Sequence, residues 1–110
     1  MRKILRYVKD THRFLRRKAF QARHGFDYTD TWSLDYSLSK WILPRLKYFK
    51  DNHTSHPGCF TPEEWDAVLG KMIAAFELIS EDDYLGDNSK QKIVDDGLDL
   101  FREFFQHLWD

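Results

Sequence analysis

Residues 61–79, TPEEWDAVLGKMIAAFELI, form the most complete helix signal in the sequence and decide its fold class. Thr61 can cap a helix that starts at Pro62, and Glu64 stands three residues after the cap, where a capping-box glutamate reaches back to it. Apolar residues then recur every three or four positions, which is the spacing of one helical face. This stretch therefore predicts an amphipathic helix over 62–79. Its apolar stripe is formed by Trp65, Val68, Leu69, Met72, Ile73, Phe76 and Ile79.

A second helix is predicted on the C-terminal side, over 89–109, after the acidic and turn-rich residues 80–89. Gly97 lies in the middle of this helix, where glycine costs up to about 1 kcal/mol relative to alanine. A close crossing with another helix would explain a glycine at this position. The wide apolar face consists of Ile93, Gly97, Leu100, Phe101, Phe104, Phe105, Leu108 and Trp109.

A third helix is predicted on the N-terminal side, over 31–49, with Asp30 or Thr31 as its cap. Pro44 lies inside it. Because proline cannot donate a hydrogen bond to the carbonyl of Lys40, we expect a kink or a break there. Its apolar positions share one face and are Leu34, Leu38, Trp41, Ile42, Leu46 and Phe49.

The first 24 residues predict a strongly basic helix over 3–23 that ends near Gly25. They hold nine basic residues and one acidic residue, a charge of +8, whereas the rest of the chain holds eight basic and 17 acidic residues, a charge of −9. The net charge of −1 hides this polarity, which suggests an interaction face or internal pairing. On a helical wheel the basic face consists of Arg2, Arg6, Lys9, Arg13, Arg16, Arg17 and Arg23.

Four amphipathic helices with short connections and no strand signal predict an all-α fold, a compact bundle. With 110 residues and no long linker, residues 1–110 are expected to form a single domain. Residues 1–24 would be a basic helix that docks on this bundle or on a partner. The tryptophans are expected to fill the core, namely Trp32, Trp41, Trp65 and Trp109.

Composition narrows the setting in which the protein works. Cys59 is the only cysteine, so no intrachain disulfide can form, and this fits a reducing compartment. No apolar run is long enough for a membrane span, and none follows the basic N-terminus as a secretory signal would require. We therefore expect a cytoplasmic protein.

The loop at 51–60 holds the only residues that suggest a metal or a nucleophile: His53, His56 and Cys59. These are zinc-ligand types, but a structural zinc site takes four ligands and no second Cys/His pair exists. A Cys–His catalytic pair would use the same residues. A polar loop with an incidental cysteine is the preferred interpretation. Because phosphate-binding, nucleophile-elbow and zinc-protease motifs are also absent from the sequence, we expect no metal, no cofactor and no enzymatic activity.

Several short motifs follow one another along the chain: WSLDY at 32–36, ILPRL at 42–46, TPEEWD at 61–66, Met72-Ile73 with Phe76, GLDLFREFF at 97–105 and LWD at 108–110. In this order they resemble a widespread family of small hypothetical proteins encoded by tailed bacteriophages. The resemblance covers the chain from about Gly25 to its end. It implies a context, expression inside an infected bacterium, but the family has no assigned activity and transfers no functional residues.

Three functions follow as hypotheses. The first is a non-enzymatic phage accessory protein that binds and modulates a host macromolecule, a host protein above all, in counter-defence or host takeover. The second is a nucleic-acid-binding module that uses the basic helix, since arginine suits phosphate and carboxylate groups. The third is a protein that sequesters a nucleotide, with Arg23 or Arg45 near Trp32 or Trp41. Oligomers of the chain are compatible with each. An anionic membrane surface or a merely solvated face are the alternatives for the arginines.

Overall fold

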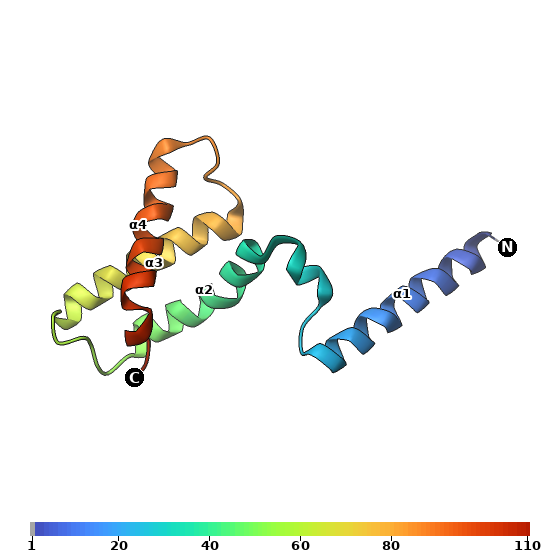
Figure 1. Ribbon diagram of the computed structural model, residues 1–110, viewed down its shortest axis with the longest axis horizontal. Coiled ribbons are helices and arrows are strands. Elements are labelled where there is room, and N and C mark those ends of the chain that lie inside the picture. Colours follow the sequence, from blue (N-terminus) through green and yellow to red (C-terminus); the bar gives the residue numbers. More distant parts are fainter. Residues whose placement is uncertain (1) are drawn as a thin grey trace. The chain divides into compact units, whose positions relative to one another are not determined.

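Helices make up the fold, as Figure 1 shows for a computed structural model that describes the backbone of residues 2–110 and the side chains of residues 6–110. The prediction of an all-α fold is confirmed, because the described residues form no strand. The chain divides into two compact units, residues 1–34 and 35–110, and each is described by itself. The elements are α1 (Arg2–His24), η1 (Tyr28–Ser33), α2 (Leu34–Asn52), α3 (Pro62–Glu81), α4 (Asn88–Phe104) and η2 (Phe105–His107), where η marks a 3₁₀-helix.

The helix α3 begins as its capping signal predicts. The Thr61 hydroxyl accepts a hydrogen bond from the backbone N–H of Glu64 at 3.1 Å, and the Glu64 carboxylate accepts one from the backbone N–H of Thr61 at 3.0 Å. The helix ends two residues later than predicted, at Glu81. Asp82 follows in the left-handed conformation (φ 53°) and donates its N–H to the carbonyl of Ile79.

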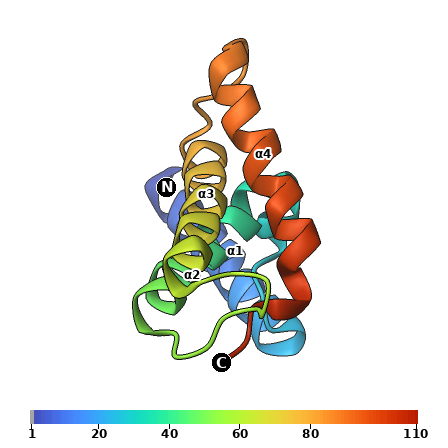
Figure 2. The same cartoon turned by 90° about the vertical axis from the view of Figure 1, so that its left-hand side faces the viewer.

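The core of residues 35–110 forms around α3. Trp65, Leu69 and Met72 are fully buried, and α2 and α4 add Leu46 and Val94 from either side. Figure 2 looks onto this unit and shows α4 beside α3. Most large buried side chains come from one helix because α3 is the most apolar of the four.

The helix α4 crosses α3 closely at Gly97, which confirms the reason proposed for a glycine at that position. Asp87 caps its N-terminus by accepting hydrogen bonds from the N–H groups of Ser89 and Lys90. The prediction of one helix over 89–109 is too long at its C-terminal end. The α-helix stops at Phe104, and its last turn tightens into η2, a common end for an α-helix.

The helix α2 corrects the prediction for 31–49 at both ends. It starts at Leu34 and runs to Asn52. Residues 28–33 before it form η1, and Asp27 caps this 3₁₀-helix. The predicted cap of α2 by Asp30 or Thr31 is therefore wrong, because both residues lie inside η1. The helix is unbroken at Pro44. Because Pro44 lies on the exposed side, the carbonyl that loses its intrahelical donor can bond water instead, so the break is not required.

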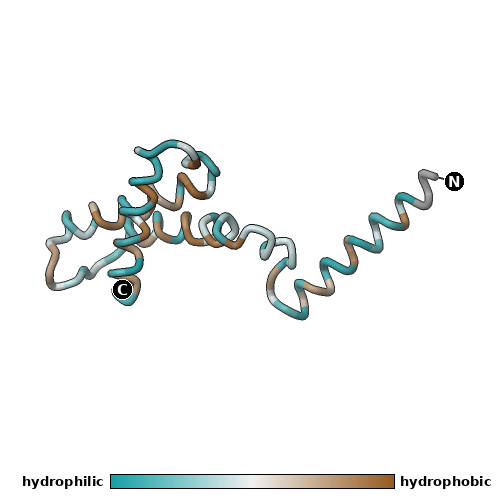
Figure 3. The backbone as a smooth tube through the Cα atoms, turned by 45° about the horizontal axis from the view of Figure 1, so that its top comes forward, coloured by the Kyte–Doolittle hydropathy of each residue, from teal (hydrophilic) through white to brown (hydrophobic). Residues whose placement is uncertain are grey.

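The helix α1 extends one residue beyond its prediction at each end. Gly25 ends it in the left-handed conformation (φ 82°), as expected for a glycine stop, and donates its N–H to the Gln21 carbonyl at 2.7 Å. Figure 3 shows apolar positions recurring between hydrophilic ones along this helix. Tyr7, Val8 and Leu15 on its apolar side are more than half exposed.

The tryptophan prediction is right for one residue of four. Trp65 is fully buried, whereas Trp32, Trp41 and Trp109 are 75%, 56% and 71% exposed. Similarly, Leu38 lies on the exposed side of α2, whereas Leu46 is buried. The single apolar face predicted for this helix is therefore two neighbouring stripes, one exposed and one packed on the core. No helix in the described part of the chain is both long and apolar enough to cross a membrane.

Candidate functional site

A groove lined by cations runs along one side of α1 within the N-terminal unit. Its volume is about 820 Å³. Lys9, Arg13, Arg16 and Arg23 place one positive side chain at nearly every turn of the helix, and a turn advances about 5.4 Å. The complete lining is Lys9, His12, Arg13, Arg16, Ala19, Phe20, Arg23, His24 and Tyr28.

One end of the groove is formed by the corner at which the chain leaves α1 and enters η1. The Asp27 carboxylate accepts hydrogen bonds from the Arg17 guanidinium, from the Gln21 amide at 3.1 Å and from the backbone N–H of Thr29 at 3.0 Å. The Arg17 bond, followed by the Thr29 bond, lowers the pKa of Asp27 from its usual range to about 2. The same contact raises the pKa of Arg17, so both groups are charged at neutral pH.

Aromatic rings pack inside this corner. The Phe20 ring lies 4.1 Å from the His24 ring, centroid to centroid, and meets the rings of Phe26 and Tyr28 edge to face at 5.5 Å each. Tyr28 in turn meets Trp32 edge to face at 6.0 Å. Because Phe20 holds the start of η1 against α1, Tyr28 is placed beside the cations rather than free in solution.

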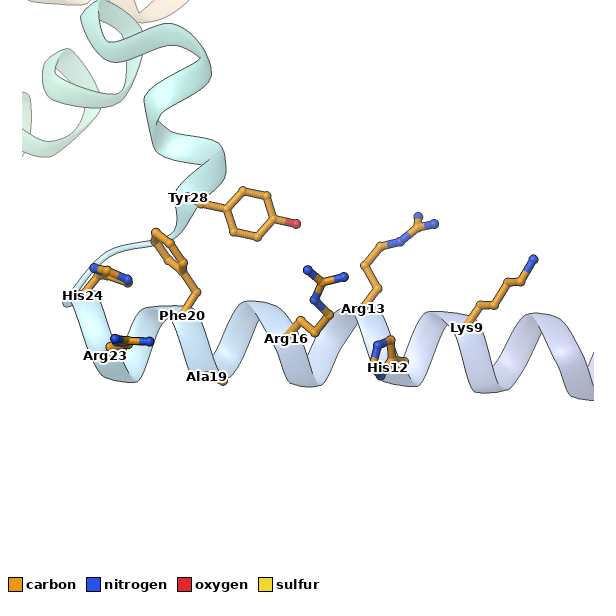
Figure 4. A pocket seen from close by; sticks show the side chains of 9 residues that line it. All are labelled: Lys9, His12, Arg13, Arg16, Ala19, Phe20, Arg23, His24 and Tyr28. Carbon is orange, nitrogen blue, oxygen red and sulfur yellow. The ribbon is translucent and has the colours of Figure 1, made fainter.

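Figure 4 shows how the groove is built. Tyr28 extends from η1 over α1, and its hydroxyl points along the helix toward the side on which Arg16 and Arg13 stand. Lys9 continues the row farther along α1. Phe20 and Tyr28 are half-buried, while the cations of the groove are exposed. The groove therefore combines a row of accessible positive charges with two anchored aromatic rings.

The cations of the groove differ from Arg17 in their electrostatic surroundings. Arg17 is neutralised by Asp27. Within residues 6–34, Lys9, Arg13, Arg16 and Arg23 form no ion pair. Exposed like charges at this spacing repel one another, so the row favours an anion that would lie along it.

The basic face predicted from the sequence is thus divided by the structure. Lys9, Arg13, Arg16 and Arg23 line the groove, whereas Arg17 turns to Asp27, and Arg6 is exposed outside the groove lining. The side chain of Arg2 lies outside the described residues. Sequence reasoning missed the groove residues that carry rings or no charge. The only hint of these residues in the sequence was Phe20, an apolar residue on the basic face of the helix. The missed residues are His12, Ala19, Phe20, His24 and Tyr28.

The residues considered for a metal or a nucleophile do not come together. The His53 ring forms two hydrogen bonds, one between Nε2 and the Asp66 carboxylate at 2.6 Å and one between Nδ1 and the Ser55 carbonyl at 3.0 Å. His56 turns to the carbonyl of Pro57, and Cys59 is exposed with a free thiol. Within residues 6–110, no three His, Cys, Asp or Glu side chains are grouped in a way that could hold a metal ion.

The C-terminal residue is held by the loop that follows α2, and Figure 2 shows this loop passing beside the C-terminus. The Asp110 carboxylate accepts hydrogen bonds from the backbone N–H and hydroxyl groups of both Thr54 and Ser55, at 2.9–3.0 Å. These bonds, the Thr54 N–H first, lower the pKa of Asp110. The contact fastens the end of the chain to the bundle.

A second exposed feature lies on α2, an aromatic stripe formed by Leu38, Trp41, Arg45 and Tyr48. These residues are spaced by three, four and three positions, so they share one side of the helix. Leu38 and Trp41 are more than half exposed, and Tyr48 is 72% exposed. The Arg45 guanidinium lies over the Trp41 ring at 4.0 Å from its centroid. Of the arginine–tryptophan pairs expected for a nucleotide site, Arg45 and Trp41 are thus in contact.

Comparison of the chain with models of protein families, with curated proteins and with solved structures gives no match.

Proposed function

We propose that this protein binds nucleic acid through the groove of α1, as a binding protein rather than an enzyme. The observation that carries the proposal is the row formed by Lys9, Arg13, Arg16 and Arg23, accessible and without ion pairs within residues 6–34. Phosphates at regular intervals along a strand match cations at regular intervals along a helix. Such contacts release bound counterions, which drives the association.

Arginine supports phosphate as the anion. Three of the four cations are arginine, whose planar guanidinium can donate two parallel hydrogen bonds to one phosphate. The overall pI near 6.5 does not oppose this role, because the positive charge is concentrated in the first 24 residues. The resemblance to phage proteins would make the ligand a host or phage nucleic acid in the bacterial cytoplasm.

The test is a titration of labelled DNA and RNA with the full chain at about 50 mM and 200 mM salt. We expect binding that weakens steeply between these two concentrations, and loss of binding in the charge-reversal variant Arg13→Glu/Arg16→Glu. A matched control is Lys71→Glu/Arg102→Glu, which makes the same charge change in residues 35–110. Absence of binding at the lower salt concentration would refute the proposed function, and so would equal loss in the control variant.

A second candidate is the binding of a protein partner, which the aromatic stripe of α2 favours. Exposed tryptophan, tyrosine and arginine are the residue types that dominate protein interfaces. Arg45 within the stripe sets the chemistry of the partner, which would present an apolar face with a carboxylate opposite this guanidinium. A host protein is the partner that the phage context suggests.

The protein-partner candidate is tested by comparing two variants with similarly exposed tryptophans. A protein captured from bacterial lysate by the wild-type chain should, once purified, bind wild type and Trp109→Ala but lose affinity for Trp41→Ala. Replacing Arg45 by Glu should weaken the same complex. Equal binding to wild type and Trp41→Ala would exclude the aromatic stripe as the interface.

A further inference from the structure

The corner between α1 and η1 indicates which form of nucleic acid the groove accepts. Tyr28 stands at the end of the cation row, and Trp32 lies against it with 75% of its surface exposed. Aromatic rings beside a basic row are the features that single-strand-binding proteins use, since bases stack on the rings while the backbone follows the charges.

We propose that the groove of α1 binds single-stranded nucleic acid, with bases stacked on Tyr28 and Trp32 and phosphates on Arg16, Arg13 and Lys9. This inference rests on the proposed function and adds its substrate class. A base within a duplex is already stacked on both faces and paired at its edge, so it cannot reach the Tyr28 ring in a concave corner. Only an unpaired base can turn into it.

The arrangement of the corner sets the path that a bound strand follows along α1. Phe20 fixes the Tyr28 ring at 5.5 Å between centroids, and Arg17 with Asp27 holds the start of η1. From Lys9 to Arg23 the helix rises about 21 Å at 1.5 Å per residue, long enough for several phosphates. A strand that places bases at Tyr28 and Trp32 therefore continues along α1 toward Lys9.

Tyr28 and Trp32 serve different purposes in a test. Tyr28 is half-buried and packs on Phe20, so its replacement can disturb the corner. Trp32 is largely exposed, and among residues 6–34 its ring meets only that of Tyr28, so its replacement by alanine should leave the corner folded. Trp109 is 71% exposed in residues 35–110 and provides the matched control.

The experiment measures fluorescence anisotropy of labelled oligonucleotides of about 16 nucleotides, at the upper end of the site sizes of small single-strand-binding modules. The probes are oligo-dT, oligo-U and a DNA duplex of equal length. We expect both single strands to bind more tightly than the duplex. Trp32→Ala should weaken single-strand binding by about tenfold, the effect of losing one stacked base. It should leave duplex binding unchanged, as should Trp109→Ala for all probes.

The outcomes separate this inference from the proposed function. Equal affinity for single strands and duplex, with no effect of Trp32→Ala, would overturn the stacking proposal and leave a groove that binds phosphates of any nucleic acid. No binding of any probe at low salt would overturn both. Equal weakening by Trp32→Ala and Trp109→Ala would also overturn the stacking proposal.

Discussion

Gly97 of α4 lies directly against Ala75 of α3. A Cβ atom placed on Gly97 would come within 2.4 Å of the Ala75 Cβ and within 2.5 Å of the Lys71 carbonyl oxygen. Neither neighbour is a flexible side-chain end, so no small adjustment makes room. The two residues set how closely α3 and α4 approach each other.

Replacing Gly97 by alanine should therefore destabilise the protein, although alanine is the better helix former by about 1 kcal/mol. We expect the free energy of unfolding to fall by about 1–3 kcal/mol, the usual cost of overpacking. Gly70→Ala in α3 is the matched control, because a Cβ atom placed on Gly70 would meet nothing nearer than Lys50 Cε at 3.9 Å. That variant should gain up to about 1 kcal/mol. Urea denaturation measures the free energy of unfolding of both variants. A Gly97→Ala protein as stable as wild type would contradict this close crossing.

The corner at Asp27 should resist acid to an unusually low pH. The pKa of Asp27 is lowered to about 2 by Arg17 and by the backbone of Thr29. A lowered folded-state pKa gives stability that is present above the ordinary aspartate pKa and is lost as the pH falls toward the folded value. We expect a carboxyl titration near pH 2 by NMR. In Arg17→Met the midpoint should rise toward the usual range, and an unchanged midpoint would show that Arg17 is not its main partner.

Cations with and without an internal partner should contribute unequally to nucleic-acid binding. Arg13 has no ion pair within residues 6–34, so Arg13→Gln should lower the salt dependence of single-strand binding by about 0.7 in the logarithmic slope. Arg17 is neutralised by Asp27, so Arg17→Gln should change this slope less. Circular dichroism would check that both variants keep their helices. A larger change in slope for Arg17→Gln would mean that the ion pair opens on binding.

The contact of Asp110 with the loop after α2 should contribute to the stability of residues 35–110. Asp110→Asn removes the charge from the group that accepts four donors of Thr54 and Ser55, so the midpoint of thermal unfolding should fall. Asp99→Asn, at an exposed position of α4, makes the same change as a control. Because the pKa of Asp110 is lowered, the difference from wild type should shrink in acid as Asp110 protonates. A constant difference down to low pH would argue against this contact.

The sequence was most informative where local and tertiary preferences agree. The capping box at Thr61 and Glu64 and the apolar stripe of 62–79 predicted α3 almost to the residue, since a cap and one continuous apolar face are local properties. The close helix crossing at Gly97 was also predicted, because glycine destabilises a helix interior and a close approach of another helix is a common reason for it there. In the basic helix, charge periodicity located Arg13 and Arg16 on the face that forms the groove.

Periodicity failed where the environment of a side chain depends on another segment. Leu38 and Trp41 have helical spacing, but the surface of α2 that packs on the core is the neighbouring one, with Leu46. Pro44 lies on an exposed side, so α2 continues through it. Spacing along a helix gives the angle between residues but not the direction in which the rest of the protein lies.

The amino-acid sequence alone determined the all-α class, the cap of α3 at Thr61, the stop of α1 at Gly25, and the concentration of positive charge in the first 24 residues, because these depend on residues within a few positions of one another. Only the tertiary structure decided that Phe20 packs on Tyr28, that Arg17 pairs with Asp27, and that the remaining cations form one groove beside two rings. These contacts require the chain to turn back at Gly25, and the position of η1 after that turn depends on the packing of its own side chains against α1.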